Sequence, residues 1–152
     1  MQLFLELLPA ILVMIGVFLA VVLAGIGSAK GVSMVAKAAT ALISEQPEKF
    51  GQSLVLQMLC ATQGLYGFIV GFMIFMNLRE GLPFYLALRY LTAGVMIAVS
   101  GYVTAIEQAA AATAAMQILA KKPEHSTKGV IYAAMIETYA IFSFVIAVLI
   151  LM

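Results

Sequence analysis

Glu137 is the one acidic residue in the last apolar stretch of the chain, the segment IYAAMIETYAIFSFVIAVLILM at residues 131–152. With the two residues before it, this stretch gives about 36 Å of helix, enough for the roughly 30 Å hydrocarbon core of a bilayer. Glu137 follows Glu124 by thirteen residues and should therefore lie near the middle of the membrane. A carboxylate at that depth costs a few to many kcal/mol unless it is neutralised or paired. The segment predicts a site for proton or cation handling, with a protonated, hydrogen-bonded glutamate between helices as the structural alternative.

Polar residues that could surround this acid lie in two other apolar segments. Four residues of the second segment fall at i, i+3, i+4 and i+7, on one face of a helix: Leu59, Thr62, Gln63 and Tyr66. Gln108, in the third segment, comes thirteen residues before Lys121 and should lie at a similar depth. The side chains of Thr62, Gln63 and Tyr66 must find polar partners in the middle of the membrane.

Glu137 and its candidate partners are all hard oxygen ligands: one carboxylate, two amides, one hydroxyl and one phenol. Such a set suits a small hard cation better than a soft metal, and its single negative charge balances a monovalent ion. Two alternatives stay open. One is an interhelical hydrogen-bond network, worth about 0.6 kcal/mol per contact. The other is a proton-only site in which the amides are hydrogen-bond partners of Glu137.

The composition is that of an integral membrane protein. Of the 152 residues, 64% are hydrophobic and 10% charged, with a mean hydropathy of +1.12, which argues against a soluble core. The net charge of +1 gives no indication of nucleic-acid binding. Apolar runs at 3–29, 53–76, 85–104 and 129–152 predict an all-α membrane protein with four transmembrane helices and short loops. The chain should form a single membrane domain, residues 1–152.

The chain repeats itself. Pro47 and Pro123 each follow a long helix of small residues, and each precedes a helix with a polar group at its centre. We interpret this as two tandem helical hairpins of parallel orientation, residues 1–76 and 84–152. Gln63 comes sixteen residues after Pro47, and Glu137 fourteen after Pro123. On this interpretation Gln63 is the counterpart of Glu137, and the third loop is about two residues shorter than the first.

Charge placement predicts the orientation in the membrane. The first and third loops (44–51 and 121–127) and their flanks carry five lysines: Lys37, Lys49, Lys121, Lys122 and Lys128. The second loop (77–83) and its flank carry two arginines, Arg79 and Arg89. The positive-inside rule therefore puts loops 1 and 3 in the cytoplasm and both termini on the extracellular side of the cell membrane.

Lys30 and Glu107 should lie at nearly the same depth, in the first and third helices. We hypothesise that they neutralise each other as an ion pair, either within one subunit or between neighbouring subunits. The alternative is that both face a lumen filled by lipid or water.

These motifs resemble a known family. GIGSAKG in helix 1, ATQGLYGF in helix 2, ILAKKPEH at loop 3 and AAMIETYA in helix 4 look like the membrane rotor subunit of V-type and A-type ATPases. This is the proteolipid, or K subunit, of the c-ring, and the chain looks most like its bacterial sodium-pumping branch. The resemblance implies a ring of identical subunits, with helices 1 and 3 inside and helices 2 and 4 outside. It also implies a non-catalytic subunit, because ATP would be hydrolysed in the soluble head of the complex.

The resemblance also implies roles for individual residues. The Na⁺ ligands would be the Glu137 carboxylate, the amide oxygens of Gln63 and Gln108, the Thr62 hydroxyl and the Leu59 carbonyl. Tyr66 matches the residue that hydrogen-bonds the carboxylate and holds the site shut. In similar proteins the two residues after the Leu59 position can be Pro and Gly, which help to free that carbonyl. Here they are Cys and Ala, at positions 60 and 61.

The resemblance further implies partners. A static subunit would carry an essential arginine that displaces the ion from Glu137, and a central stalk would dock on loops 1 and 3.

Two glutamine oxygens and the Thr62 hydroxyl favour Na⁺ over H⁺ as the cargo, because a proton needs no such cage. The competing functions are a proton-carrying ring of the same type, a small proton-coupled multidrug exporter, and a purely structural proteolipid or pore.

Overall fold

The computed structural model describes the backbone of residues 1–152 and all side chains except those of residues 2, 3 and 5. The chain forms long α-helices and two short 3₁₀ helices, labelled η. In chain order the elements are α1 (Gln2–Glu45), η1 (Pro47–Lys49), α2 (Phe50–Leu59), α3 (Thr62–Met76), α4 (Phe84–Lys121), η2 (Pro123–His125) and α5 (Ser126–Leu151).

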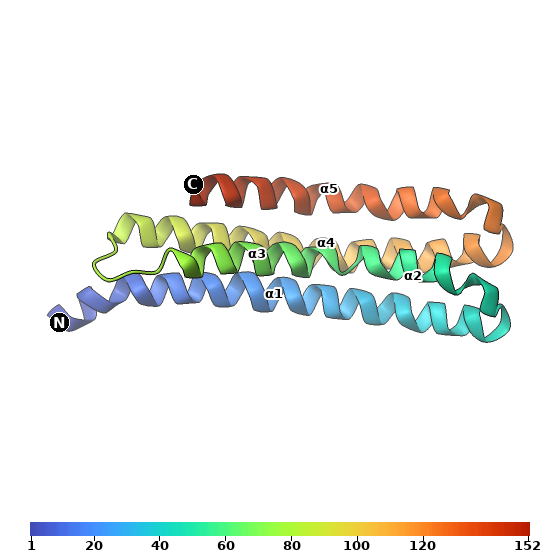
Figure 1. Ribbon diagram of the computed structural model, residues 1–152, viewed down its shortest axis with the longest axis horizontal. Helices are drawn as coiled ribbons and strands as arrows, with labels where there is room; N and C mark the ends of the chain where they lie inside the picture. Colours follow the sequence, from blue (N-terminus) through green and yellow to red (C-terminus); the bar gives the residue numbers. More distant parts are fainter.

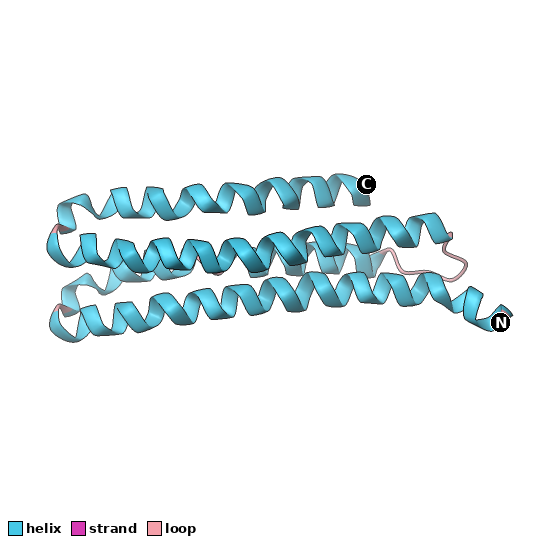
Figure 2. Cartoon of the chain, turned by 180° about the vertical axis from the view of Figure 1, so that it is seen from behind, coloured by secondary structure: helices cyan, strands magenta, loops and turns pink.

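These elements form four parallel rods, which are α1, α2 with α3, α4, and α5 (Figure 1). Both termini and the 77–83 loop lie at one end of the bundle, while η1 and η2 lie at the other, as both views show (Figure 2). The four rods are long and apolar enough to cross a membrane: Glu6–Glu45, Pro47–Met76, Phe84–Lys121 and Pro123–Leu151. The predicted all-α fold of four transmembrane helices in two hairpins is confirmed.

Small residues set the close packing of α1 on α4, the most extensive helix contact in the chain. A Cβ atom added to Gly27 would lie 2.6 Å from the Tyr102 Cα, and one added to Gly94 would collide with the Gly16 carbonyl. In lipid no hydrophobic effect draws helices together, so the van der Waals contacts of such close packing drive their association instead. α3 packs against both α1 and α4, whereas α5 packs mainly on α4 and touches α3.

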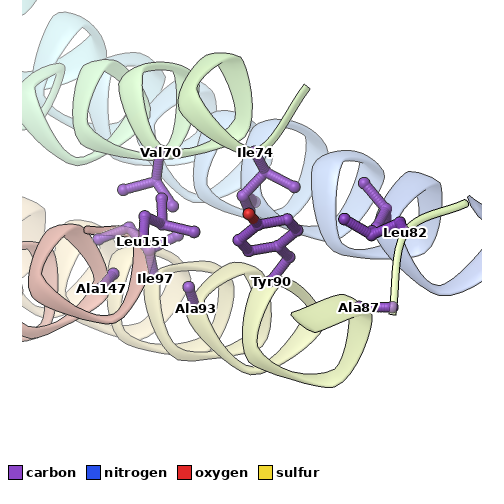
Figure 3. Packing of buried hydrophobic residues seen from close by; sticks show 11 residues of the cluster. Val70, Ile74, Leu82, Ala87, Tyr90, Ala93, Ile97, Ala147 and Leu151 are labelled. Atoms are coloured by element: carbon purple, nitrogen blue, oxygen red, sulfur yellow. The ribbon is translucent and has the colours of Figure 1, made fainter. Parts of the chain in front are cut away.

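The buried apolar residues form two clusters, one toward each end of the bundle. The cluster nearer the termini includes Val70 and Ile74 of α3, Tyr90 and Ile97 of α4, and Leu151 of α5, which point toward one another (Figure 3). The other cluster includes residues 35, 56, 109 and 133, nearer η1 and η2. By chain position the buried polar residues of the middle, Gln63 and Gln108, fall between the two.

The structure corrects two details of the repeat. The helix predicted from the apolar run at 53–76 is interrupted, because α2 ends at Leu59 and α3 begins at Thr62. The prediction of a shorter third loop is wrong. Each loop is one 3₁₀ turn beginning at a proline, and the next helix begins three residues after that proline in both hairpins. The two loops have the same length because the same proline motif builds both of them.

Candidate ion-binding site

The interruption between α2 and α3 creates the first part of the site. The N–H groups of residues 60 and 61 bond carbonyls three residues back, at 3.3 and 3.0 Å, instead of the four-residue spacing of an α-helix. At the break the Leu59 carbonyl accepts a hydrogen bond from Thr62 Oγ1 at 2.9 Å. A break with no Pro or Gly thus brings the Leu59 carbonyl and the Thr62 hydroxyl together.

Two glutamines at the centre of the bundle extend this pair inward. Gln63 of α3 and Gln108 of α4 are both fully buried, and Gln63 Nε2 donates to Gln108 Oε1. Thr62 Oγ1 lies 3.4 Å from Gln63 Oε1 and joins the break to the glutamine pair. The two amides, predicted at one depth from separate helices, are brought together.

Glu137 of α5 closes the site from the other side. Its Oε2 lies 3.5 Å from Gln108 Nε2, and its Oε1 accepts a hydrogen bond of 2.7 Å from the Tyr66 hydroxyl. The Tyr66 ring stacks on Phe144 with ring centroids 5.1 Å apart. Phe144 was missed in the sequence, although it lies two helical turns after Glu137 on the same helix face.

The predicted residues thus form one continuous chain of hydrogen bonds across the bundle. It runs in this order: Leu59, Thr62, Gln63, Gln108, Glu137 and Tyr66. All of them offer oxygen to a cation, and rotating a glutamine amide exchanges its NH₂ group for its oxygen. Among the described residues, no three His, Cys, Asp or Glu side chains are grouped as a metal cluster would need. One carboxylate with neutral oxygens fits a hard monovalent cation.

Burial differs across the site in a way that bears on ion access. The glutamines are sealed inside, whereas Glu137 is only half-buried, on the side of α5 that borders α3. In the single chain the carboxylate therefore lies between the interior of the bundle and its outer surface.

Lys30 and Glu107 lie outside this site. Both side chains are exposed in the single chain, and Lys30 Nζ donates to the Tyr102 hydroxyl at 3.1 Å and lies 5.2 Å from the centre of that ring. Within one chain, then, the ammonium is bound by a tyrosine of α4. Among the described residues the two side chains form no ion pair within one chain, and pairing with Glu107 of a neighbouring copy stays a prediction.

Two curated relatives resemble this chain over most of its length. The chain is 54% identical to the V-type sodium ATPase subunit K of Enterococcus hirae over 133 residues, which cover 88% of this chain and 85% of the relative. It is 34% identical to the A-type ATP synthase subunit K of Methanocaldococcus jannaschii over 143 residues, which cover 94% of this chain but 63% of that relative.

A family model, that of the ATP synthase C subunit, matches the chain twice, at residues 15–74 and 91–150. The two matches are equally long and are offset by 76 residues (91 − 15), the same offset as between Pro47 and Pro123. This offset makes Ala61, at the helix break, the counterpart of Glu137, so the assignment of Gln63 as that counterpart is wrong. Because the model matches both hairpins, the chain belongs to the family of the ATP synthase C subunit.

Proposed function

We propose that this chain is the ion-translocating rotor subunit of a rotary V-type ATPase, which carries Na⁺ on Glu137 during ATP-driven transport. The observation that carries the proposal is the continuous chain of hydrogen-bonding oxygens from Leu59 to Glu137 at mid-membrane depth. The 54% identity to a protein named as a sodium ATPase subunit supports Na⁺ as the cargo.

The charge balance explains how such a site can turn through lipid. An ionised Glu137 alone costs several kcal/mol or more in the hydrocarbon, whereas a carboxylate with a bound Na⁺ is nearly neutral. Gln63, Gln108 and Thr62 replace the water that the ion loses on entry. The hydroxyl of Tyr66 holds the carboxylate in place from the outer side.

Release requires a competing cation. An arginine on a static partner subunit would attract the Glu137 carboxylate and displace the ion, and the emptied site would reload from an aqueous half-channel.

Only the second hairpin carries a carboxylate at this position, because its counterpart in the first hairpin is Ala61. Each chain therefore moves one ion per four helices. Fewer ions per turn means more free energy per ion, which favours pumping over ATP synthesis.

Several copies of the chain must form a closed ring, with α1 and α4 on the inside and α3 and α5 toward the lipid. Large apolar side chains are exposed along α1, α3 and α5 of the single chain and suit contacts with neighbouring copies and with lipid. We place η1 and η2 in the cytoplasm, where their shared end of the bundle would meet the central stalk. Both termini would then be extracellular.

A proton-carrying ring of the same type is the second candidate. The hydrogen bond from Gln108 to Glu137 supports this candidate, because it could also hold a protonated carboxyl group in place. A small multidrug exporter has less support, because the family match covers both hairpins.

Carbodiimide labelling of Glu137 in the purified ring separates the two cargoes. At fixed pH, Na⁺ should protect Glu137 from the reagent, because a bound ion occupies the carboxylate oxygens. Protection by raised pH alone, with no effect of Na⁺, would favour the proton.

On a native gel the chain should run as a stable ring of high mass, whereas a monomer or dimer would contradict the rotor assignment.

A further inference from the structure

We propose that Ser28 of α1 is a positioning residue for the ion site, although it is not a ligand. Its hydroxyl oxygen accepts the Gly64 N–H beyond the break between α2 and α3, and this bond keeps the break open. An open break keeps the Leu59 carbonyl and the Thr62 hydroxyl turned into the site. The inference rests on the proposed function for what the site binds.

The contact itself is short and partly buried. Gly64 N lies 2.7 Å from Ser28 Oγ, and Ser28 is only 7% exposed. The two helices approach closely here, since a Cβ added to Gly64 would lie 3.1 Å from both the Cβ and the Oγ of Ser28. A glycine at position 64 thus lets the serine reach the backbone of the neighbouring helix.

The bond replaces one that a regular helix would make. In an unbroken α-helix the Gly64 N–H would donate to the carbonyl of residue 60, and the Gln63 N–H would claim the Leu59 carbonyl. Within a membrane, a broken helix persists only where freed backbone groups find other partners, and serine hydroxyls are among those that supply them. Ser28 gives the Gly64 N–H such a partner and so favours the broken conformation over the continuous one.

The second hairpin provides an internal comparison. Thr104 stands 76 residues after Ser28, at the same place in the repeat, but its hydroxyl donates to the Ser100 carbonyl of its own helix at 2.7 Å. The helix opposite, α5, runs unbroken through residues 136 and 137, the counterparts of 60 and 61. A hydroxyl that reaches across to a backbone N–H therefore accompanies the broken helix and is absent from the unbroken one.

The experiment compares Ser28→Ala with Thr104→Ala in the purified ring, using the Na⁺ concentration that half-protects Glu137 from carbodiimide. Loss of the hydrogen bond to the Gly64 N–H should weaken Na⁺ binding about five- to twentyfold in Ser28→Ala. Thr104→Ala, which removes a hydroxyl bonded within its own helix, should stay within about twofold. Ser28→Cys, with a weaker acceptor, should lie between wild type and Ser28→Ala.

Hydrogen exchange adds a readout that general loss of stability does not imitate. In Ser28→Ala, exchange should fall in the peptide covering 60–66, because closing the break gives the N–H groups of residues 63 and 64 helical partners, and it should stay unchanged in the peptide covering 136–142. Unaltered Na⁺ protection in Ser28→Ala, with a wild-type ring that Na⁺ protects, would overturn this inference alone. Absence of Na⁺ protection in wild type would instead remove the proposed function. If Ser28→Ala forms no ring, Ser28→Cys decides, and wild-type Na⁺ dependence in that variant would also overturn the inference.

Discussion

The Tyr66 hydroxyl donates a hydrogen bond of 2.7 Å to Glu137 Oε1 and so ties α3 to α5 at the edge of the site. The donor and the acceptor come from different hairpins of the repeat. The carboxylate is thus held by the first hairpin on the side where it borders the surface of the bundle.

Tyr66→Phe should weaken the retention of the ion without disturbing the fold. The variant keeps the ring that stacks on Phe144 and loses only the hydroxyl. A hydrogen bond to a charged group contributes about 1.5–3 kcal/mol, so Na⁺ affinity should fall roughly ten- to a hundredfold. Na⁺ titration of carbodiimide labelling measures this. Tyr90→Phe, in the apolar cluster near the termini, serves as the control and should leave the titration unchanged.

Gln108→Leu tests whether the amides form a cation cage. It removes one proposed ligand and leaves the buried Gln63 amide without its partner, at a cost of about 1–3 kcal/mol. Na⁺ protection of Glu137 should be largely lost, while protection by raised pH persists, because deprotonation needs no cage. Gln117→Leu changes an exposed glutamine of the same helix and should behave as wild type. Equal Na⁺ protection in the two variants would show that Gln108 is not a ligand of the ion.

Lys49→Met should loosen the end of the bundle that we assign to the stalk. Lys49 is 8% exposed, and its ammonium donates to the Ala120 carbonyl at 3.0 Å, which joins η1 to the last turn of α4. Loss of this hydrogen bond from a charged donor should cost about 1–2 kcal/mol of stability. Thermal dissociation of the ring measures the loss. Lys122→Met, at an exposed lysine of the other loop, should dissociate at the wild-type temperature, and the same temperature in Lys49→Met would refute the link.

Much of this architecture can be predicted from the sequence, because a lipid bilayer limits the secondary structures that a chain crossing it can adopt. Apolar runs of membrane length, separated by proline-containing loops, predicted the helices, and the spacing of Thr62, Gln63 and Tyr66 predicted one polar face. Chain position relative to loop 3 placed Gln108 and Glu137 at one depth. The structure brings these residues into one hydrogen-bond chain.

The break between α2 and α3 could not be predicted, because Cys and Ala carry no intrinsic preference for ending a helix there. The break depends on tertiary contacts, since the partner of the Gly64 N–H is Ser28 on another helix. Phe144 escaped notice because an aromatic residue in an apolar helix ordinarily indicates packing alone. The counterpart of Glu137 was misassigned because Gln63, a polar residue at nearly the same spacing, is chemically a closer match than Ala61.

The most direct test of the account is to count Na⁺ ions bound per chain in the purified ring with radioactive sodium. The account predicts one ion per chain in wild type, none in Glu137→Gln, and one in Glu107→Gln, because Glu107 lies outside the hydrogen-bond chain. Binding that survives in Glu137→Gln, or a wild-type ring that binds no Na⁺, would contradict it.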